Sequence, residues 1–175
     1  MLFGDPAAFA VEAIIEPGPE FPAFFGSNIT GRFRLFVAGL EVGEFAEPSC
    51  VLRPLSQHLV VKCASARSLW HESLAGKTPA GWFKLLNESL YLVGFPEPTD
   101  AYHRMDFLTN VSEALNNVKG FLVSPPGAPL HALIQLPESE AVHHHVIPLG
   151  EFCSAAGQFA AWLAEKELEL LQRGA

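Results

Sequence analysis

The chain has 175 residues, of which 49% are hydrophobic, and carries a formal net charge of −8 at pH 7. A chain of this length and apolar content can bury one ordinary core without a metal or disulfides, so we expect a single domain spanning residues 1–175. The acidic balance argues against nucleic acids and anionic membranes as partners, because contacts with phosphate depend on Lys and Arg. No apolar run approaches the ~20 residues that a helix needs to cross a bilayer.

The first 45 residues predict strands. Residues 9–15 alternate, with interruptions, between apolar and polar side chains, which is typical of a strand. Residues 29–40 alternate more regularly and place both arginines of this region, Arg32 and Arg34, on one face. A short Ala-Gly step at 38–39 then leads into a second run, 40–45, so we expect a hairpin.

The middle of the chain predicts mainly helices. Within residues 49–66, apolar side chains recur at every fourth position behind Pro54, which favours a helix, whereas the adjacent Val60 and Val61 favour a strand; we prefer the helix. A threonine followed by proline at 78–79 is a typical helix start, and it predicts a helix over residues 79–90.

Two further elements precede the C-terminal region. Residues 102–109 look like a strand. An asparagine and a glutamate at capping positions then predict a short helix over residues 111–118, closed by Gly120.

Three short apolar runs follow, at residues 120–124, 130–136 and 142–147. The proline-rich turns between them are too short for helical crossovers, so the runs predict an antiparallel meander. Residues 149–173 then carry an apolar stripe at helical spacing, and we expect this helix to cover one face of the meander. The predicted fold class is α+β: a mostly antiparallel sheet formed by the N-terminal hairpin and the C-terminal meander, about four helices, and a long C-terminal helix packed on one sheet face.

Trp162 does not belong to the apolar stripe of the last helix, because it lies ~110° from the centre of that stripe. Large aromatic side chains outside a core stripe are enriched at interfaces, so Trp162 is a candidate contact for a partner. The alternative is that a loop, such as the proline-rich segment 17–26, folds over it.

Three histidines are the candidate metal ligands. If the hairpin register places Ile134 and Leu136 beside the valines of the next strand, then His131, His143 and His145 share the outer face of the meander. No acidic or cysteine residue at matching spacing completes such a site, so we expect no metal and no cofactor. Motifs of hydrolases, metalloproteases and dinucleotide enzymes are also missing, and we expect no catalysis.

The three cysteines, Cys50, Cys63 and Cys153, are widely spaced and form no CxxC motif. The first ten residues lack the regions of a secretory signal. We therefore expect three buried thiols and a cytoplasmic location.

Acidic residues are concentrated near the N-terminus, where residues 1–47 contain seven acidic side chains against two arginines. A basic protein partner would be steered toward this part of the chain, with Glu41, Glu44 and Glu47 as the candidate contacts. The alternative is a solvated acidic surface that only keeps the protein soluble.

Several N-terminal motifs resemble a known family. They are Met-Leu-Phe-Gly-Asp at 1–5, Phe-Ala-Val-Glu at 9–12, the strand and turn at 31–39 with Val-Gly at 42–43, and Leu-Ser at 55–56. Together they resemble the immunity protein 42 family of bacterial polymorphic toxin systems over residues 1–60, although Ala-Gly replaces the family's Asn-Gly turn and the proline insert at 17–22 is longer.

This resemblance implies a cytosolic α+β protein that binds and neutralises a cognate toxin and has no catalytic activity. It supplies no interface residues. Two other functions remain compatible with the sequence: a small enzyme or metal-dependent protein that uses His131, His143 and His145, and a structural or oligomerisation module. A homo-oligomer is compatible with each of them.

Overall fold

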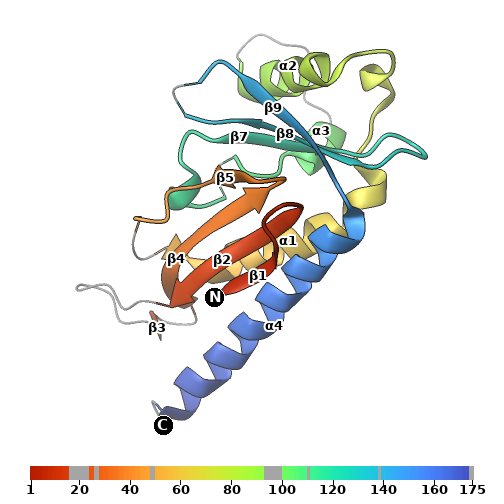
Figure 1. The fold of residues 1–175 in the computed structure, drawn as a ribbon. Helices are drawn as coiled ribbons and strands as arrows, with labels where there is room; N and C mark the ends of the chain where they lie inside the picture. Colours follow the sequence, from red (N-terminus) through yellow and green to blue (C-terminus); the bar gives the residue numbers. More distant parts are fainter. Residues whose placement is uncertain are drawn as a thin grey trace.

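The computed structural model of the chain describes residues 1–15, 24–25, 28–47, 50–92, 100–109, 111–137 and 139–173. In these residues the fold is α+β, with two antiparallel sheets and four α-helices (Figure 1). None of the helices in the described part of the chain combines the length and the apolar character needed to cross a membrane.

The N-terminal sheet is built around one long strand, β4. Its strands are β1 (Leu2–Asp5), β2 (Phe9–Ile15), β3 (Phe24–Phe25), β4 (Asn28–Val37), β5 (Leu40–Val42) and β6 (Cys50–Val51). Strand β2 lies between β1 and β4, while β3, β5 and β6 each pair with β4. The predicted hairpin is confirmed, since Val37 pairs with Leu40. Strand β1 was not predicted.

The predicted C-terminal meander is also confirmed. Its strands are β7 (Lys119–Val123), β8 (Leu130–Gln135) and β9 (Val142–Ile147), in that order in the sheet. Helix α2 (Pro79–Tyr91) packs against one face of it, where Trp82 meets the edge of the His131 ring and Phe83 meets Phe121. The start of α2 is as predicted, because the Gly81 amide donates to the hydroxyl oxygen of Thr78 at 3.3 Å.

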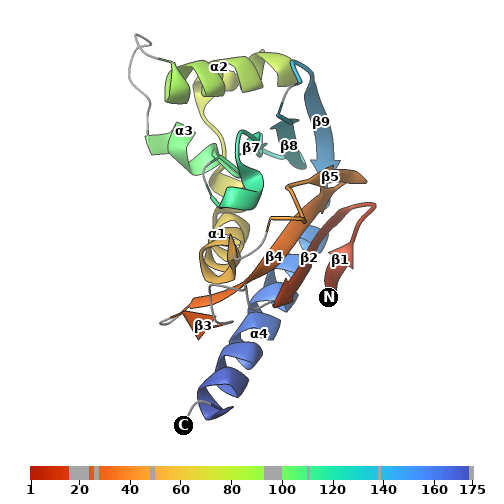
Figure 2. The ribbon, with the colours of Figure 1, turned by 90° about the vertical axis from the view of Figure 1, so that its left-hand side faces the viewer.

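The long helix α4 (Leu149–Arg173) has the predicted bounds, but the prediction that it covers the meander is wrong. Its main neighbours are β1, β2 and α1 (Leu52–Ser65), so it covers the N-terminal sheet (Figures 1 and 2). Two stripe residues show the docking: Phe152 meets Phe9 of β2 edge-on at 4.7 Å, and Phe159 packs on Phe3 of β1. The outer face of the meander is already covered by α2.

Residues 49–66 adopt the preferred helix, α1, after the short strand β6. The predicted strand over 102–109 is wrong, because residues 100–105 form helix α3 (Asp100–Met105). Its buried side chains, Tyr102 and Met105, are three residues apart, which is helical spacing. The chain then runs along β7, where the Phe107 amide donates to the Gly120 carbonyl.

The predicted helix over 111–118 is reduced to a single 3₁₀ turn, η3 (Glu113–Leu115). Two further 3₁₀ turns, η1 (Ala66–Ser68) and η2 (Glu72–Leu74), connect α1 to α2. Gly120 lies inside β7 and closes no helix; a Cβ there would come within 2.6 Å of the Leu108 side chain. The absence of a side chain at Gly120 therefore allows Leu108 to pack directly against the β7 backbone. The asparagine expected to cap the helix lies outside the described residues.

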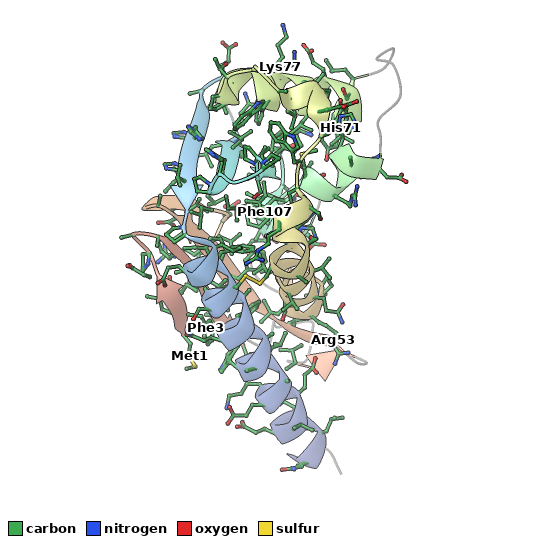
Figure 3. All side chains as sticks on the ribbon, turned by 90° about the vertical axis from the view of Figure 1, so that its right-hand side faces the viewer. Met1, Phe3, Arg53, His71, Lys77 and Phe107 are labelled. Carbon is green, nitrogen blue, oxygen red and sulfur yellow. A yellow bond between two sulfur atoms is a disulfide. The ribbon has the colours of Figure 1, made fainter. Side chains whose placement is uncertain are left out.

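The expectation of three separate thiols is wrong for two of the cysteines. Cys63 of α1 and Cys153 of α4 form a disulfide with a Cα–Cα distance of 5.3 Å (Figure 3). Farther along the same helices, the Arg53 guanidinium donates to both carboxylate oxygens of Glu167, at 2.8 and 2.5 Å. Cys50 is a buried free thiol. The two bonded cysteines are 90 residues apart, so their proximity depends on the docking of α4 beside α1.

Candidate functional site

The three candidate glutamates of the N-terminal region line one cleft. Glu41 belongs to β5, and Glu44 and Glu47 lie in the turn that follows it. Glu113 of η3 and Leu136, just after β8, line the same cavity, which has a volume of about 400 Å³. We call Glu41, Glu44, Glu47 and Glu113 with this cavity the acidic cleft. It lies where β5 of the N-terminal sheet meets residues that flank β7 and β8.

The backbone holds this turn against η3. Gly43 has a φ of 102°, a conformation that favours glycine, and a Cβ at this position would meet Leu115 at 3.2 Å. The Glu44 amide donates to the Ala114 carbonyl at 2.8 Å, and the Glu47 amide donates to the Glu44 carbonyl at 3.0 Å. The carboxylates are therefore carried on a fixed turn.

Among the described residues, positive charge reaches the acidic cleft at Glu41. Arg34 donates to Glu12 at 2.7 Å and to Glu41 at 2.6 Å, and its guanidinium lies over the ring of Phe45. The hydrogen bonds to Glu12 and then to Glu41 raise the pKa of Arg34, so it stays charged. No described residue forms an ion pair with Glu44, Glu47 or Glu113. This side of the cleft is uncompensated negative charge.

Trp162 lies elsewhere. Its ring is half-buried between Phe3 of β1, at 5.2 Å between ring centroids, and Phe159 of its own helix, at 6.1 Å. Because β2 and β4 separate β1 from β5, the structure does not bring Trp162 to the acidic cleft. The indole Nε1 is buried without a hydrogen-bond partner among the described residues. Most of the segment 17–26 lies outside those residues.

The three candidate metal ligands do not share a face, so that interpretation of the histidines is wrong. Gln135 pairs with Val142, one residue away from the register that the shared face required. His131 therefore meets His144, with 2.8 Å between Nδ1 and Nε2, while His143 and His145 stack on the other face. Among the described residues, no group of three or more His, Cys, Asp or Glu could hold a metal ion.

Sequence reasoning missed a buried polar cluster between α1, α2 and α3. Lys62 is only 6% exposed and donates to the Arg104 carbonyl at the end of α3 at 2.5 Å. Burial lowers its pKa to about 8, against the opposing effect of Asp106. Tyr91 donates to Asp106, and burial followed by this hydrogen bond raises the pKa of Tyr91.

His58 completes this cluster by donating from Nε2 to the Phe107 carbonyl at 2.8 Å. Burial, and then the charge of Lys62, lower the pKa of His58. None of the clefts that we describe is lined by these side chains, and each polar group binds a backbone carbonyl or a neighbouring side chain. The cluster therefore joins three helices. Lys62 follows Leu55 and Leu59 at helical spacing, which is the signal that could have identified it.

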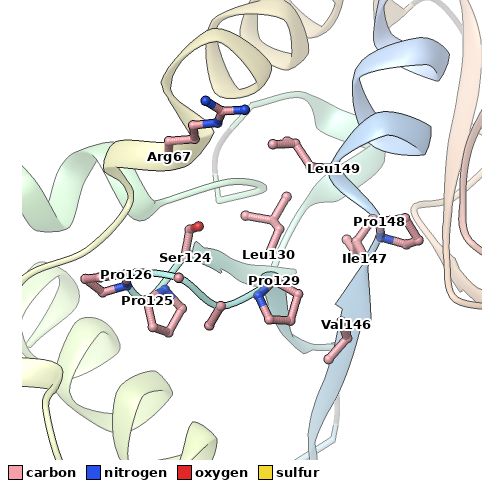
Figure 4. Close-up of a pocket in the computed structure, with 12 residues that line it drawn as sticks. Arg67, Ser124, Pro125, Pro126, Pro129, Leu130, Val146, Ile147, Pro148 and Leu149 are labelled. Carbon is pink, nitrogen blue, oxygen red and sulfur yellow. The ribbon is translucent and has the colours of Figure 1, made fainter.

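A larger cleft, of about 520 Å³, lies where β9 leads into α4 (Figure 4). The proline-rich turn between β7 and β8 forms one side, and Arg67 and Leu149 lie on the other. Arg67 and Ser124 contribute its polar side chains, and none of the predicted site residues lines it. The cleft has no pair of groups suited to acid–base or nucleophilic chemistry.

No family model matches the chain, and no curated protein matches it. The resemblance of residues 1–60 to the immunity protein 42 family therefore stays a resemblance. Among solved structures, the chain is similar to CdiI from Burkholderia dolosa AUO158, with a TM-score of 0.62 and 16% sequence identity. The match covers 92% of this chain and 99% of that chain. The fold of this protein, with its two sheets and long terminal helix, is therefore similar to the fold of CdiI over nearly the full length of both chains.

Proposed function

We propose that this protein is an immunity protein that binds a cognate bacterial toxin and neutralises it by stoichiometric occlusion. The observation that carries the proposal is the fold shared with CdiI, an immunity protein of contact-dependent growth inhibition, over nearly the full length of both chains. The N-terminal motifs support the same function by a separate route, since they resemble the immunity protein 42 family.

The chemistry of the clefts supports binding over catalysis. No histidine or cysteine lines the acidic cleft, although the buried Cys50 thiol lies behind it and donates to the Glu47 carbonyl, and the larger cleft offers one arginine and one serine. Burial raises the pKa of the Cys50 thiol, which makes it a poor nucleophile. We further propose a cytoplasmic location, where an inhibitor would meet a toxin that has entered the cell; this proposal rests on the fold shared with CdiI and not on the cysteines, since two of them form a disulfide.

The acidic cleft is the surface that we assign to the toxin. Glu44, Glu47 and Glu113 have no basic partner among the described residues, and a fixed turn holds the first two in place. A Lys or Arg of the toxin would find three carboxylates in a cavity large enough for its side chain. The toxin surface that binds here is therefore basic.

The primary test uses the toxin encoded beside the gene of this chain, since an immunity gene is expected directly downstream of its toxin. Co-expression should rescue growth of cells that make the toxin domain, and the two purified chains should form a complex of fixed stoichiometry. Rescue at amounts far below those of the toxin would contradict occlusion, because that result requires turnover.

Charge reversal tests the acidic cleft. We expect Glu41→Lys, Glu44→Lys and Glu47→Lys together to lower the association rate constant more than they raise the dissociation rate constant. Association of the unmodified chain should also slow with salt, because screening limits charge attraction to ~8 Å at physiological ionic strength. A variant with Glu44→Lys and Glu47→Lys alone keeps the Arg34 to Glu41 ion pair intact.

A matched control separates the cleft from net charge. The triple variant Glu72→Lys, Asp100→Lys and Glu151→Lys makes the same change in net charge at three exposed positions away from the cleft. It should associate with the toxin nearly as fast as the unmodified chain. Equal slowing by both triple variants would show that only overall charge matters, and the assignment of the cleft would fail.

Trp162 is the second proposed contact, on a different surface from the acidic cleft. Trp162→Ala is expected to weaken toxin binding by at least ~2 kcal/mol, as for a buried aromatic anchor. Because the ring packs on Phe3, the melting temperature must be measured on the same samples. A drop of many degrees, with binding unchanged among folded molecules, would make Trp162 a packing residue only.

A further inference from the structure

The outer edge of β9 is open. Strand β9 pairs with β8 on one side, and none of the described residues pairs with its other side. Figure 2 shows β9 at the rim of the molecule, with no helix or strand beyond it. The opposite edge of the same sheet is protected, because the Phe107 amide donates to Gly120 of β7 at 2.7 Å and Asp106 forms a β-bridge with Phe121.

Strand β9 also lacks the features that usually keep an edge from pairing. Soluble proteins protect open edges with Lys, Pro, bulges or very short strands. Strand β9 has six residues, Val142 to Ile147, without a lysine, proline or glycine. The Val146 side chain on this edge is 49% exposed. An open, regular strand of this kind is a template for another strand.

The sequence of β9 indicates which strand would pair with it. Val142-His143-His144-His145-Val146 reads the same in both directions. In an antiparallel pair centred on His144, each valine would face a valine and each histidine would face a histidine. We propose that two copies of the chain associate through β9, antiparallel and about a two-fold axis at His144, so that two three-stranded sheets become one sheet of six strands.

The side chains already adopt an arrangement that such a pair would extend. On one face the His144 ring stacks on His131, at 5.1 Å between centroids and 12° between planes. On the other face the rings of His143 and His145 lie parallel, 6.3 Å apart. Parallel rings on one face of a sheet pack well against rings of the next strand, so these histidines could pack against the histidines of β9 in a second copy. This dimer involves neither the toxin nor the acidic cleft, so it does not rest on the proposed function.

Cysteine cross-linking tests both the pairing and its register. Directly opposed residues of antiparallel strands have Cα atoms ~4.5–5.5 Å apart, within the range of a disulfide. His144→Cys should therefore form a disulfide with the same residue of a second copy under mild oxidation. Tag-free protein in EDTA at pH about 8 keeps ordinary imidazoles neutral and excludes metal bridging. The unmodified chain is the control, since Cys50 is buried and the other two cysteines are bonded.

The proposed register also predicts which cysteines at positions 142 and 146 can form a cross-link. Val142→Cys alone should not cross-link, because the two positions 142 would lie about 13 Å apart along the paired strands. A mixture of Val142→Cys and Val146→Cys should cross-link to each other. Cross-linking of Val142→Cys with itself as efficient as that of His144→Cys would overturn the proposed register, and no cross-link for any variant would overturn the pairing.

Light scattering on a sizing column tests the dimer without cross-links. The unmodified chain should be dimeric at high concentration, and Val146→Lys should be monomeric with an unchanged melting temperature. Val61→Lys is the matched control, because Val61 is an exposed valine on α1, 61% exposed, and this variant should stay dimeric. A monomer at the highest soluble concentration, or equal dimerisation of both lysine variants, would overturn the proposal.

Discussion

The N-terminal sheet is covered by two helices that are cross-linked to each other, whereas the C-terminal sheet is covered by one helix that packs through aromatic rings. Helices α1 and α4 share the Cys63–Cys153 disulfide and the Arg53–Glu167 ion pair. Helix α2 has neither kind of link to the meander among the described residues and meets it through Trp82 and Phe83.

Helices α2 and α4 are held on their sheets in two different ways. Helix α2 is close in sequence to the strands it covers, and its N-terminus is set by its own cap. Helix α4 covers strands that come more than 100 residues earlier in the chain, so its docking closes a long loop at an entropic cost. Covalent and ionic links offset that cost. We therefore expect the largest stability losses from changes at the interface of α4.

The largest expected loss is at Phe159, which is fully buried between α4 and β1. Phe159→Ala should lower the free energy of unfolding by ~3–5 kcal/mol, because it opens a cavity in the core. Denaturant unfolding measures this loss. Leu168→Ala is the control on the same helix, since Leu168 is 60% exposed. A loss below about 1 kcal/mol for Phe159→Ala would show that α4 is docked elsewhere.

The disulfide should rank second. Replacing both cysteines, Cys63→Ser with Cys153→Ser, should lower the free energy of unfolding by ~2–4 kcal/mol, since the bond restricts a long loop in the unfolded chain. Reductant should destabilise the unmodified protein by a similar amount and leave the double variant unchanged. If reductant affects both proteins equally, the bond does not account for the difference.

A smaller loss is expected on the C-terminal side. The indole of Trp82 donates to the Leu74 carbonyl at 2.9 Å in a buried position. Trp82→Phe keeps most of the ring contact with His131 but removes one of the two donors to that carbonyl, the other being the Lys77 amide at 3.2 Å, so we expect a cost of ~1 kcal/mol. A loss as large as that of Phe159→Ala would contradict the view that the α4 interface dominates stability.

The ion pair of the two cross-linked helices should contribute less. A double-mutant cycle with Arg53→Ala and Glu167→Ala should give a coupling energy of ~0.5–1 kcal/mol, because the pair is bidentate but partly exposed. The pair Lys84 and Glu88 on α2 is the control, since its 3.8 Å separation at an exposed site predicts a smaller coupling. Equal couplings would show that bidentate geometry adds nothing here.

Acid should produce a gradual loss that is shared by several groups. Burial lowers the pKa values of His58, His131 and His145 below the ordinary 6.5. Below pH about 6.5 the unfolded chain then binds more protons than the folded chain, so stability falls as pH falls. Melting temperatures between pH 8 and 5 measure this slope. His58→Gln should reduce it, and an unchanged slope would show that His58 does not contribute.

The local part of the fold could be predicted from the sequence, and the long-range part could not. The hairpin, the meander and the start of α2 follow from short patterns and turns, and all three are correct. The strand predicted over 102–109 is wrong because its first buried side chains, Tyr102 and Met105, are at helical spacing, a signal that the prediction did not use. The partner of α4 depends on docking, which its own apolar stripe does not specify.

The candidate site shows the same limit. Glu41, Glu44 and Glu47 were chosen from the acidic N-terminal part of the chain, and they line one cleft. Glu113 was missed because η3 reaches this cleft only after two sheets have come together. The histidines were grouped on one face because the assumed register was one residue away from the real one. A register is fixed by the packing of both faces, which a single strand does not reveal.

The Cys63–Cys153 disulfide has a topological consequence for the chain. Its two ends enclose α2, α3 and all three strands of the meander in one covalent ring. A protease that cuts the exposed turn between β7 and β8 would therefore yield two fragments that stay joined until the bond is reduced. After such a cut, α2 stays attached through Cys63 and β9 through Cys153, so the strand that we assign to self-association and the helix that covers its sheet remain in one covalent molecule.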